Sequence, residues 1–260
     1  FLTASEEYNG TAWTEGNDMG TAGYAFSGTG TQTAALAAGR FNNQNPPTPP
    51  LRDDSEEYNG TSWTEGNNIQ TARAAAAMAG TQTAAALFGG SEGPNFASGN
   101  NGVGEEYDGT SWSETNDMNT ARRYLAGIGT QTAALGVSGY SPPGGNAQVE
   151  HYDGTNWTEG PDVLTLRRGG GSSGTQTAAL FFGGDPRGDP YVSDKTESYD
   201  GTAWATAPSL ATERRLLGGS PSGTSTSALG ASGYVTAVIT NTEEFTGDTT
   251  TETASTIDFD

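Results

Sequence analysis

Apolar and polar positions follow one pattern that recurs along this chain of 260 residues. The motif Tyr-(Asn/Asp)-Gly-Thr-x-Trp occurs five times, ending at Trp13, Trp63, Trp112, Trp157 and Trp204. The tryptophans are 45 to 50 residues apart; each is followed six residues later by an apolar residue, and four of the five are followed eighteen residues later by a threonine. A period of this length predicts a repeated supersecondary unit that buries its apolar face against the next unit.

Within one unit the pattern predicts four short strands, a to d, and no helix. Strand a is expected over Arg73 to Ala79 and strand b over Thr83 to Phe88, followed by strand c over Gly104 to Tyr107 and strand d over Ser111 to Glu114. Asn-Gly and Asp-Gly between strands c and d favour tight hairpin turns, because these residues accept a positive φ. The alanines and glycines of strands a and b suit inner positions, where converging sheets leave no room for large side chains.

Four strands per unit with a Tyr…Trp hairpin are typical of a β-propeller blade. In detail the chain resembles the kelch repeat family. The matching elements are an arginine before strand a, a glycine pair after strand b (Gly89-Gly90, Gly183-Gly184), Glu-x-Tyr-Asp-Gly in strand c and the tryptophan of strand d. The chain departs from that pattern at Ser138-Gly139 and at Gly230-Ala231. The expected fold is therefore all-β, a five-bladed β-propeller of four-stranded kelch-like blades.

The ends of the chain leave two ways to close the ring. Strand c appears a sixth time, as Glu243 to Gly247, but without a following tryptophan. Either the N-terminal c–d hairpin (residues 1–16) or residues 240–260 complete the blade that the last a–b pair begins. We favour the N-terminal hairpin, because its motif is intact. Residues 1–247 then form a single propeller domain, and residues 248–260 are a tail or a closing strand.

Opposite charges recur in a fixed register. A glutamate lies two residues before each tyrosine, and an arginine lies ten residues after four of the five tryptophans: Arg73, Arg122, Arg167 and Arg214. The first unit has Gly23 at that position. Buried glutamate and arginine are tolerated only as pairs, so we expect these residues to pair within or between blades. The recurring tyrosines and tryptophans are expected to fill the core.

Composition narrows the classes of function. A net charge of −20, with 11 Lys and Arg, disfavours nucleic acid as a partner, and no apolar run is long enough for membrane insertion. With no cysteine and one histidine, His151, the chain offers neither a transition-metal site nor a Cys–His or Ser–His pair. We therefore predict no catalytic residues, no metal and no cofactor. A hydrolase that uses two of the 31 carboxylates stays open.

Length varies almost only between strands b and c. These segments are residues 40–54, 91–103, 140–148, 185–195 and 234–240. In a four-stranded blade they share one face with the d–a connections, and binding residues concentrate on loops that a rigid scaffold holds. The candidate ligand-binding residues are the aromatics Phe41, Phe96, Tyr140 and Tyr191, the polar residues Asn43, Asn95 and Asp189, and, nearer the channel, Asp18, Asp117 and Asp162.

Exposed aromatic rings beside amides and carboxylates suit sugars, whose apolar faces stack and whose hydroxyls take hydrogen bonds. We interpret the chain as a non-enzymatic binding module for a cell-surface glycan or receptor. Two sequence motifs resemble the kelch-like repeats in tail-fibre proteins of marine bacteriophages: Gly-Thr-Gln-Thr-Ala-Ala-Leu and Glu-Glu-Tyr-Asn-Gly-Thr-Ser-Trp. That resemblance implies a virion or extracellular location, host attachment as an adhesin, and a homo-oligomer through a fibre stem. A structural or protein-interaction propeller is the alternative.

Overall fold

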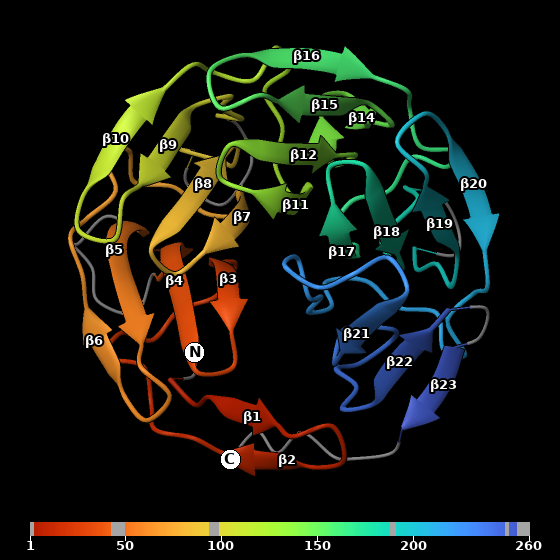
Figure 1. Ribbon diagram of the computed structural model, residues 1–260, viewed down its shortest axis with the longest axis horizontal. Coiled ribbons are helices and arrows are strands. Elements are labelled where there is room, and N and C mark those ends of the chain that lie inside the picture. The colour runs from red at the N-terminus through yellow and green to blue at the C-terminus, as the bar shows by residue number, and fades with distance from the viewer. Residues whose placement is uncertain (1–2, 43–49, 94–98, 188–190, 248–249, 254–260) are drawn as a thin grey trace.

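The computed structural model describes residues 3–42, 50–93, 99–187, 191–247 and 250–253. In this part of the chain every regular element is a strand, and no helix is long and apolar enough to cross a membrane. The sheets are arranged side by side around an axis and together form a disc (Figure 1). The prediction of an all-β propeller-like ring is therefore confirmed.

Four sheets have four antiparallel strands each, in chain order from the inside of the disc to its rim. The first contains β3 (Ser27–Thr31), β4 (Ala34–Phe41), β5 (Leu51–Tyr58) and β6 (Trp63–Glu65). The second contains β7 (Ala77–Thr81), β8 (Ala84–Phe88), β9 (Gly104–Tyr107) and β10 (Trp112–Thr115). The third contains β11 (Ala126–Thr130), β12 (Ala133–Val137), β15 (Val149–Tyr152) and β16 (Trp157–Gly160). The fourth contains β17 (Gly171–Thr175), β18 (Ala178–Phe182), β19 (Thr196–Tyr199) and β20 (Trp204–Ala207).

Three smaller sheets complete the described part of the chain. The fifth sheet of the ring contains β21 (Ser227–Ala231), β22 (Thr242–Thr246) and β23 (Thr250–Thr253). The N-terminal hairpin, β1 (Glu6–Tyr8) with β2 (Trp13–Glu15), is a sheet of its own between the fifth sheet and the first (Figure 1). A short ribbon of β13 (Tyr140–Ser141) and β14 (Gly144–Gly145) lies in the loop between β12 and β15.

Our expectation about ring closure is wrong. The last inner strand, β21, pairs with β22, and β22 pairs with β23, so the C-terminal segment rather than the N-terminal hairpin extends the fifth sheet. The missing tryptophan was a poor guide, because backbone pairing does not require it. The alternation of β22, in which Thr242, Glu243 and Phe245 are buried, matches strand c of the other units.

The core lies between neighbouring sheets, and the recurring aromatics fill it as expected. Each tyrosine of strand c stands opposite the tryptophan of strand d; the rings of Tyr107 and Trp112, for example, have centroids 4.9 Å apart. Trp157 of the third sheet also packs edge-on against Phe88 of the second, at 4.8 Å between centroids. The side chains of one unit thus complete the core of its neighbour, as a repeated unit requires.

The predicted ion pairs are confirmed in the last four units. Guanidinium nitrogens lie 2.5 to 3.2 Å from a carboxylate oxygen in Arg73–Glu105, Arg122–Glu150, Arg167–Glu197 and Arg214–Glu243. All four arginine side chains are inaccessible to solvent. Burial lowers the pKa of Arg167 to about 10, an effect that the Glu197 carboxylate opposes. Each glutamate also accepts two backbone N–H groups of the preceding d–a connection; Glu150 accepts those of Asn119 and Thr120.

The first unit makes the same ion pair with an arginine from another position. Arg40, at the end of β4, donates to Glu56 at 2.9 Å and also contacts Asp54 at 3.0 Å. Gly23 occupies the usual arginine position, where a Cβ would lie 2.8 Å from Arg40 Cδ. In the second unit the corresponding residues are Arg73 and Gly90. Arginine and glycine have therefore exchanged positions, and the buried guanidinium is retained.

A second set of contacts runs around the rim. Each strand-c tyrosine donates its hydroxyl to the residue that follows the recurring glutamate in the preceding unit. Tyr152 donates to Glu106 at 2.9 Å, and Tyr8 of the N-terminal hairpin donates to Glu244 of β22 at 2.8 Å. His151 stands at the same position, with its Nε2 3.4 Å from the hydroxyl of Tyr199. The N-terminal hairpin thus joins the fifth sheet to the first through the contact that joins the other units.

Candidate binding face

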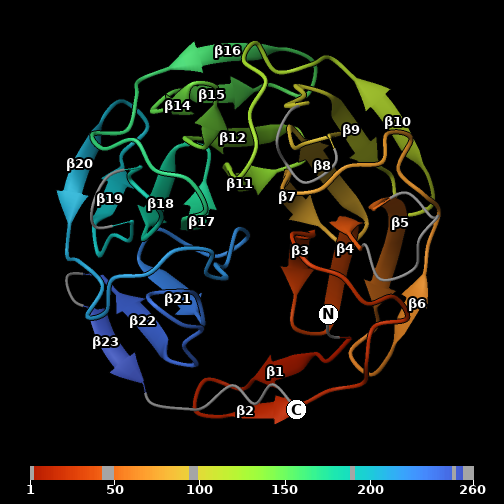
Figure 2. The same cartoon turned by 180° about the vertical axis from the view of Figure 1, so that it is seen from behind.

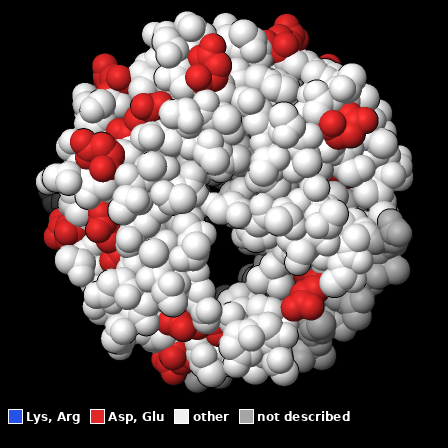
Figure 3. Space-filling model, in the orientation of Figure 1, with Lys and Arg blue, Asp and Glu red and all other residues white. Residues whose placement is uncertain are grey.

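The two faces of the disc differ in their connections and in charge. The tight a–b and c–d turns lie on one face, which we call the turn face, and the b–c and d–a connections lie on the other, the loop face (Figure 2). On the turn face Figure 3 shows carboxylates and no lysine or arginine.

The structure removes Phe41 from the candidate binding residues. Strand β4 continues to Phe41, which pairs with Leu51, so the start of the expected loop is part of the sheet. The ring of Phe41 is 1% exposed and packs against Tyr24, with centroids 5.2 Å apart. The extension pairs Arg40 with Arg52 and Phe41 with Leu51, beyond a register shift between Ala38 and Arg40. Four further candidates, Asn43, Asn95, Phe96 and Asp189, lie outside the described residues.

The remaining aromatic candidates differ in exposure. Tyr191 is 59% exposed and is one of the large exposed hydrophobic side chains of the described chain. Tyr140 is half-buried because arginines cover its ring, as described below. Both residues belong to b–c connections, as predicted.

The three aspartates are exposed, but they do not lie near the channel. Asp117 and Asp162 are two residues beyond β10 and β16, the outermost strands of their sheets. Two residues of extended chain span at most about 7 Å, so both carboxylates stay near the rim. Asp18 is three residues beyond β2 and accepts a hydrogen bond from the Thr3 hydroxyl at 2.9 Å. These aspartates are therefore separate from a site around the channel.

Arginine and tyrosine side chains gather on the loop face of the third to fifth units. Three guanidinium groups lie against the ring of Tyr140, with Cζ to centroid distances of 4.4 Å for Arg123, 5.1 Å for Arg187 and 5.4 Å for Arg168. Arg168 is also 5.9 Å from the ring of Tyr124. Guanidinium groups at such distances from aromatic rings are attracted by the ring quadrupole.

The cluster continues into the fifth unit through a shared carboxylate. Asp185 Oδ2 lies 2.9 Å from Arg168 Nη2 and 3.3 Å from Arg215 Nη1, and Arg215 stacks on Tyr234 at 5.1 Å. We call this set the arginine–tyrosine cluster: Arg123, Arg168, Arg187, Arg215, Tyr124, Tyr140, Tyr234 and Asp185.

The cluster has an excess of positive charge, since four guanidinium groups face one carboxylate. Burial lowers the pKa of Arg123, and the nearby charges of Arg168 and Arg187 lower it further. The side chains of Arg168 and Arg215 are 22% and 27% exposed, and Arg187 is exposed. Arg187 also has a φ of +63°, a region that residues other than glycine rarely adopt. An anionic group that reached this surface would meet preorganised guanidinium donors and aromatic faces.

Sequence reasoning missed this cluster, although a signal was present. The recurring arginine is followed directly by a second one in Arg122-Arg123, Arg167-Arg168 and Arg214-Arg215. Because the first arginine of each pair is fixed by its glutamate, the second stands at the same place in three adjacent units. Repetition in register therefore brings three guanidinium groups together.

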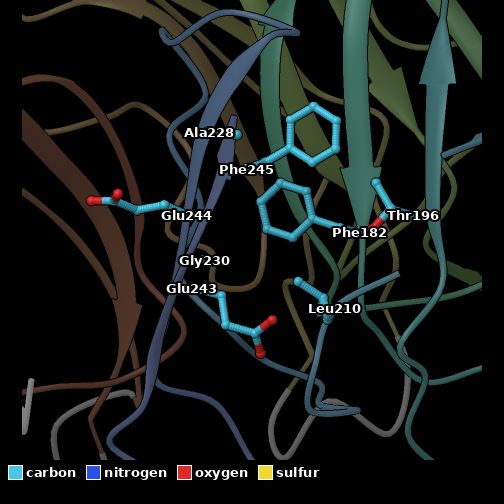
Figure 4. Close-up of a pocket in the computed structure, with 8 residues that line it drawn as sticks. All are labelled: Phe182, Thr196, Leu210, Ala228, Gly230, Glu243, Glu244 and Phe245. Atoms are coloured by element: carbon cyan, nitrogen blue, oxygen red, sulfur yellow. The ribbon is translucent and has the colours of Figure 1, made fainter. Parts of the chain in front are cut away.

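Two hollows in the described structure lie away from this cluster. The first is a cavity of about 10 Å³ between the fourth and fifth sheets, with Phe182, Phe245 and Gly230 in its wall (Figure 4). In the third unit the corresponding space next to Gly136 is occupied by Trp157. Because the sixth copy of the motif has no tryptophan, we attribute the cavity to incomplete packing.

The second hollow is an open cleft on the rim, between the N-terminal hairpin and the first sheet, lined by Glu7, Glu15, Asn17 and Tyr58 among others. Glu7 accepts hydrogen bonds from the Tyr58 hydroxyl and from Gln32. The carboxylate thus has a structural role in joining two units. Among the described residues, no group of three or more His, Cys, Asp and Glu side chains is placed to hold a metal ion.

Comparison with known proteins identifies the fold. No family model and no curated protein matches the chain. Among solved structures, one described as "Structure of YjhT" is similar with a TM-score of 0.76 and 15% sequence identity, over 96% of this chain and 91% of that one. At this identity the similarity concerns the fold alone. Together with the repeated sheets and the motifs they carry, it shows that the chain has the fold of a kelch-type β-propeller.

Proposed function

We propose that this chain is a non-enzymatic binding module that attaches to a cell-surface glycan or receptor through its loop face. The scaffold is five blades with inner strands, accompanied by the N-terminal hairpin. The resemblance to tail-fibre repeats favours an adhesin on a virion or another extracellular particle, oligomeric through a fibre stem. In this proposal the ligand carries an anionic group, such as the carboxylate of an acidic sugar.

The observation that carries the proposal is the arginine–tyrosine cluster. Five arginines of the chain are wholly buried in the scaffold ion pairs. Four of the other arginines gather in the cluster, where rings of Tyr140 and Tyr234 lie beneath guanidinium groups. Guanidinium groups bind carboxylates with two parallel hydrogen bonds, and an uncovered tyrosine ring offers a face on which a sugar ring stacks. Tyr191, exposed in the same connection as Arg187, extends this surface.

A glycan array that pairs acidic glycans with their neutral counterparts tests the proposal. The wild-type chain should bind the acidic members, and the binding should weaken as salt rises, because salt screens exposed charges. Arg187→Glu places a negative charge in the cluster and should lower the affinity at least about tenfold, which corresponds to the loss of one charge-assisted hydrogen bond. Tyr191→Ala should weaken binding while the fold is retained.

Arg52→Glu is the matched control, because it makes the same change of charge at a side chain that is 36% exposed in another unit. It should leave binding close to that of the wild type. If Arg187→Glu binds as well as the wild type, or if both variants lose binding equally, the cluster is not the site. Equal binding of acidic and neutral glycans would also contradict an anionic ligand.

A protein partner is the second candidate, and exposed aliphatic side chains favour it. Leu166 and Leu216 are 38% and 56% exposed. Leu166 lies close to Arg187, since a Cβ on Gly145 would approach both side chains. An acidic peptide with apolar residues would suit this surface. Binding that is lost in Leu166→Ala but is independent of glycans would favour this interaction function.

A further inference from the structure

The disc has more outer c–d hairpins at its rim than inner a–b strand pairs. Six c–d hairpins stand around the rim: those of the five sheets and the β1–β2 hairpin, which the bond from Tyr8 to Glu244 and the bond from Tyr58 to Glu7 place in the series. Five of the six have their own inner strand b, namely β4, β8, β12, β18 and β21. In the described part of the chain, β1 pairs with β2 alone.

A series of backbone hydrogen bonds around the channel stops at the same place. In each bond the N–H group of one residue donates to the C=O group of the corresponding residue in the preceding unit, at 2.7 or 2.8 Å. The bonds run from Leu216 to Gly169, from Gly169 to Tyr124, from Tyr124 to Ala75 and from Ala75 to Ala25. These five residues occupy the same register position in successive units and have a positive φ. Among the described residues the series has no member between Ala25 and Leu216, which face each other across the position of the N-terminal hairpin.

A second series between the units ends at the same position. The amides of Gly90, Gly139 and Gly184 each donate to the carbonyl of the buried arginine in the next unit, at 2.7 to 3.0 Å. The corresponding residue of the fifth unit is Gly233, for which the described chain offers no next arginine.

A set of glutamines on the turn face shows the same gap. Gln82, Gln131 and Gln176 donate to carbonyls of strands b and c in the preceding unit. Gln32, whose preceding unit is the N-terminal hairpin, donates instead to the Glu7 side chain. Each of these three series therefore lacks the contacts that an inner pair at the N-terminal hairpin would supply.

The space next to the hairpin is open. Figure 3 shows an opening through the disc that lies off-centre, on the side of β1. The middle of the channel is partly filled by the a–b turn of the fifth unit, where the Ser222 hydroxyl bonds Gly80 C=O at 2.7 Å and contacts Thr29 at 3.1 Å. The opening thus occupies the position of a sixth inner pair.

We propose that this position receives a sixth inner β-hairpin, of the same kind as the five inner pairs and joined to the chain ahead of Phe1. The placement follows the order of the repeat, in which each inner pair directly precedes its own outer hairpin. The occupant has small residues, a tight Gly-Thr-Gln turn and a buried arginine. It closes both backbone series by accepting from Gly233 N–H and Ala25 N–H and by donating to Leu216 C=O.

A fusion that supplies the hairpin tests this inference. In this fusion a copy of residues 119–144 is joined directly ahead of Phe1. The copied Arg122 then lies 28 residues before Glu6. Arg122 and Glu150 have the same separation in the third unit. Amide hydrogen exchange should then slow about tenfold or more at Ala25 and Gly233, as expected for one new hydrogen bond. The melting temperature should rise, and the added copy should resist proteolysis.

The matched control carries Ile128→Pro and Leu135→Pro in the added copy only, because proline prevents strand pairing at these positions. It should leave exchange at Ala25 and Gly233 at the wild-type rate. The inference is overturned if the intact fusion also leaves these rates unchanged, or if its added copy is cleaved as readily as the proline control. Exchange reports the scaffold and not ligand binding, so the outcome is independent of the glycan assay.

Discussion

Replacing Arg122 by alanine should destabilise the protein more than any exposed substitution. Arg122 is fully buried; its Nη2 lies 2.9 Å from Glu150 Oε1, and its Nη1 donates to Ser138 C=O at 3.0 Å and to Gln148 C=O at 2.5 Å. Arg122→Ala leaves the Glu150 carboxylate, itself 2% exposed, without its cation.

Removing one partner of a buried ion pair costs about 3–5 kcal/mol. A chain of this size loses roughly 2–4 °C in melting temperature for each kcal/mol. We therefore expect a melting temperature about 6–20 °C lower. Urea unfolding followed by tryptophan fluorescence gives the free energy of unfolding directly.

Two further variants identify the cause of that loss. Arg52→Ala removes an arginine whose side chain is 36% exposed and 3.8 Å from Asp54, so it should change the free energy of unfolding by less than about 0.5 kcal/mol. Adding Glu150→Gln to Arg122→Ala removes the uncompensated charge and should recover about 1–3 kcal/mol. A loss below about 1 kcal/mol in Arg122→Ala, or no recovery in the double variant, would refute the reasoning that the buried charge pair decides stability.

Three other substitutions follow from particular features of the units. Gly23→Arg and Arg40→Gly should each destabilise the chain by about 3 kcal/mol or more, whereas the double variant, which restores the usual arrangement, should recover most of that loss in urea unfolding. Ala228→Val adds two methyl groups at the wall of the cavity between the fourth and fifth sheets and should raise the free energy of unfolding by about 0.5–2 kcal/mol; an unchanged value would contradict the packing explanation. Burial lowers the pKa of His151, so the wild type should lose stability as pH falls below about 6.5, the unfolded value. His151→Glu, which supplies the usual acceptor for Tyr199, should abolish that loss.

The sequence predicts the scaffold well because every unit must meet the same packing and ion-pairing requirements, so the residues that meet them occur several times. The tyrosines, tryptophans and buried arginines recur in register, so their neighbours in space follow from their neighbours in the pattern. Element bounds were less accurate. The pattern predicts that strand a starts at Arg73, but β7 begins at Ala77, because Ala75 has a φ of +55° and interrupts the extended backbone.

The glycine pair shows how alignment by residue type can fail. In the fifth unit the residue pattern places the pair at Gly230-Ala231, but the matching conformation belongs to Ser232, with a φ of +57°, and Gly233, with a φ of +118°. Gly89 and Gly90 have φ values of +69° and +110°. The backbone conformation is therefore retained where serine replaces the first glycine, and the residue pattern alone does not reveal it.

The candidate site was predicted less well than the fold, for a physical reason. Its residues come from loops that differ in length from unit to unit, so the repeat does not predict the direction of a loop side chain. The pattern predicts an exposed Phe41, but the ring is buried because β4 extends to Phe41, which pairs with Leu51. The arginine–tyrosine cluster depends on contacts between three units, such as the carboxylate of Asp185 between Arg168 and Arg215.

The buried arginines connect scaffold and binding face. Arg122 Nη1 donates to Ser138 and Gln148, the residues at the two ends of the loop between β12 and β15. Arg167 makes the corresponding two bonds to the carbonyls of Gly183 and Lys195, and Arg214 makes them to the carbonyls of Ser232 and Asn241. One guanidinium thus fixes both ends of a b–c loop while it neutralises a buried glutamate. Because the ends are fixed from within the blade, the loop between them can change in length and sequence at little cost to the fold. This arrangement explains why a strict repeat carries variable segments on one face, and why Arg123, Arg168 and Arg215, each next to a fixed arginine, hold the same position in three adjacent units.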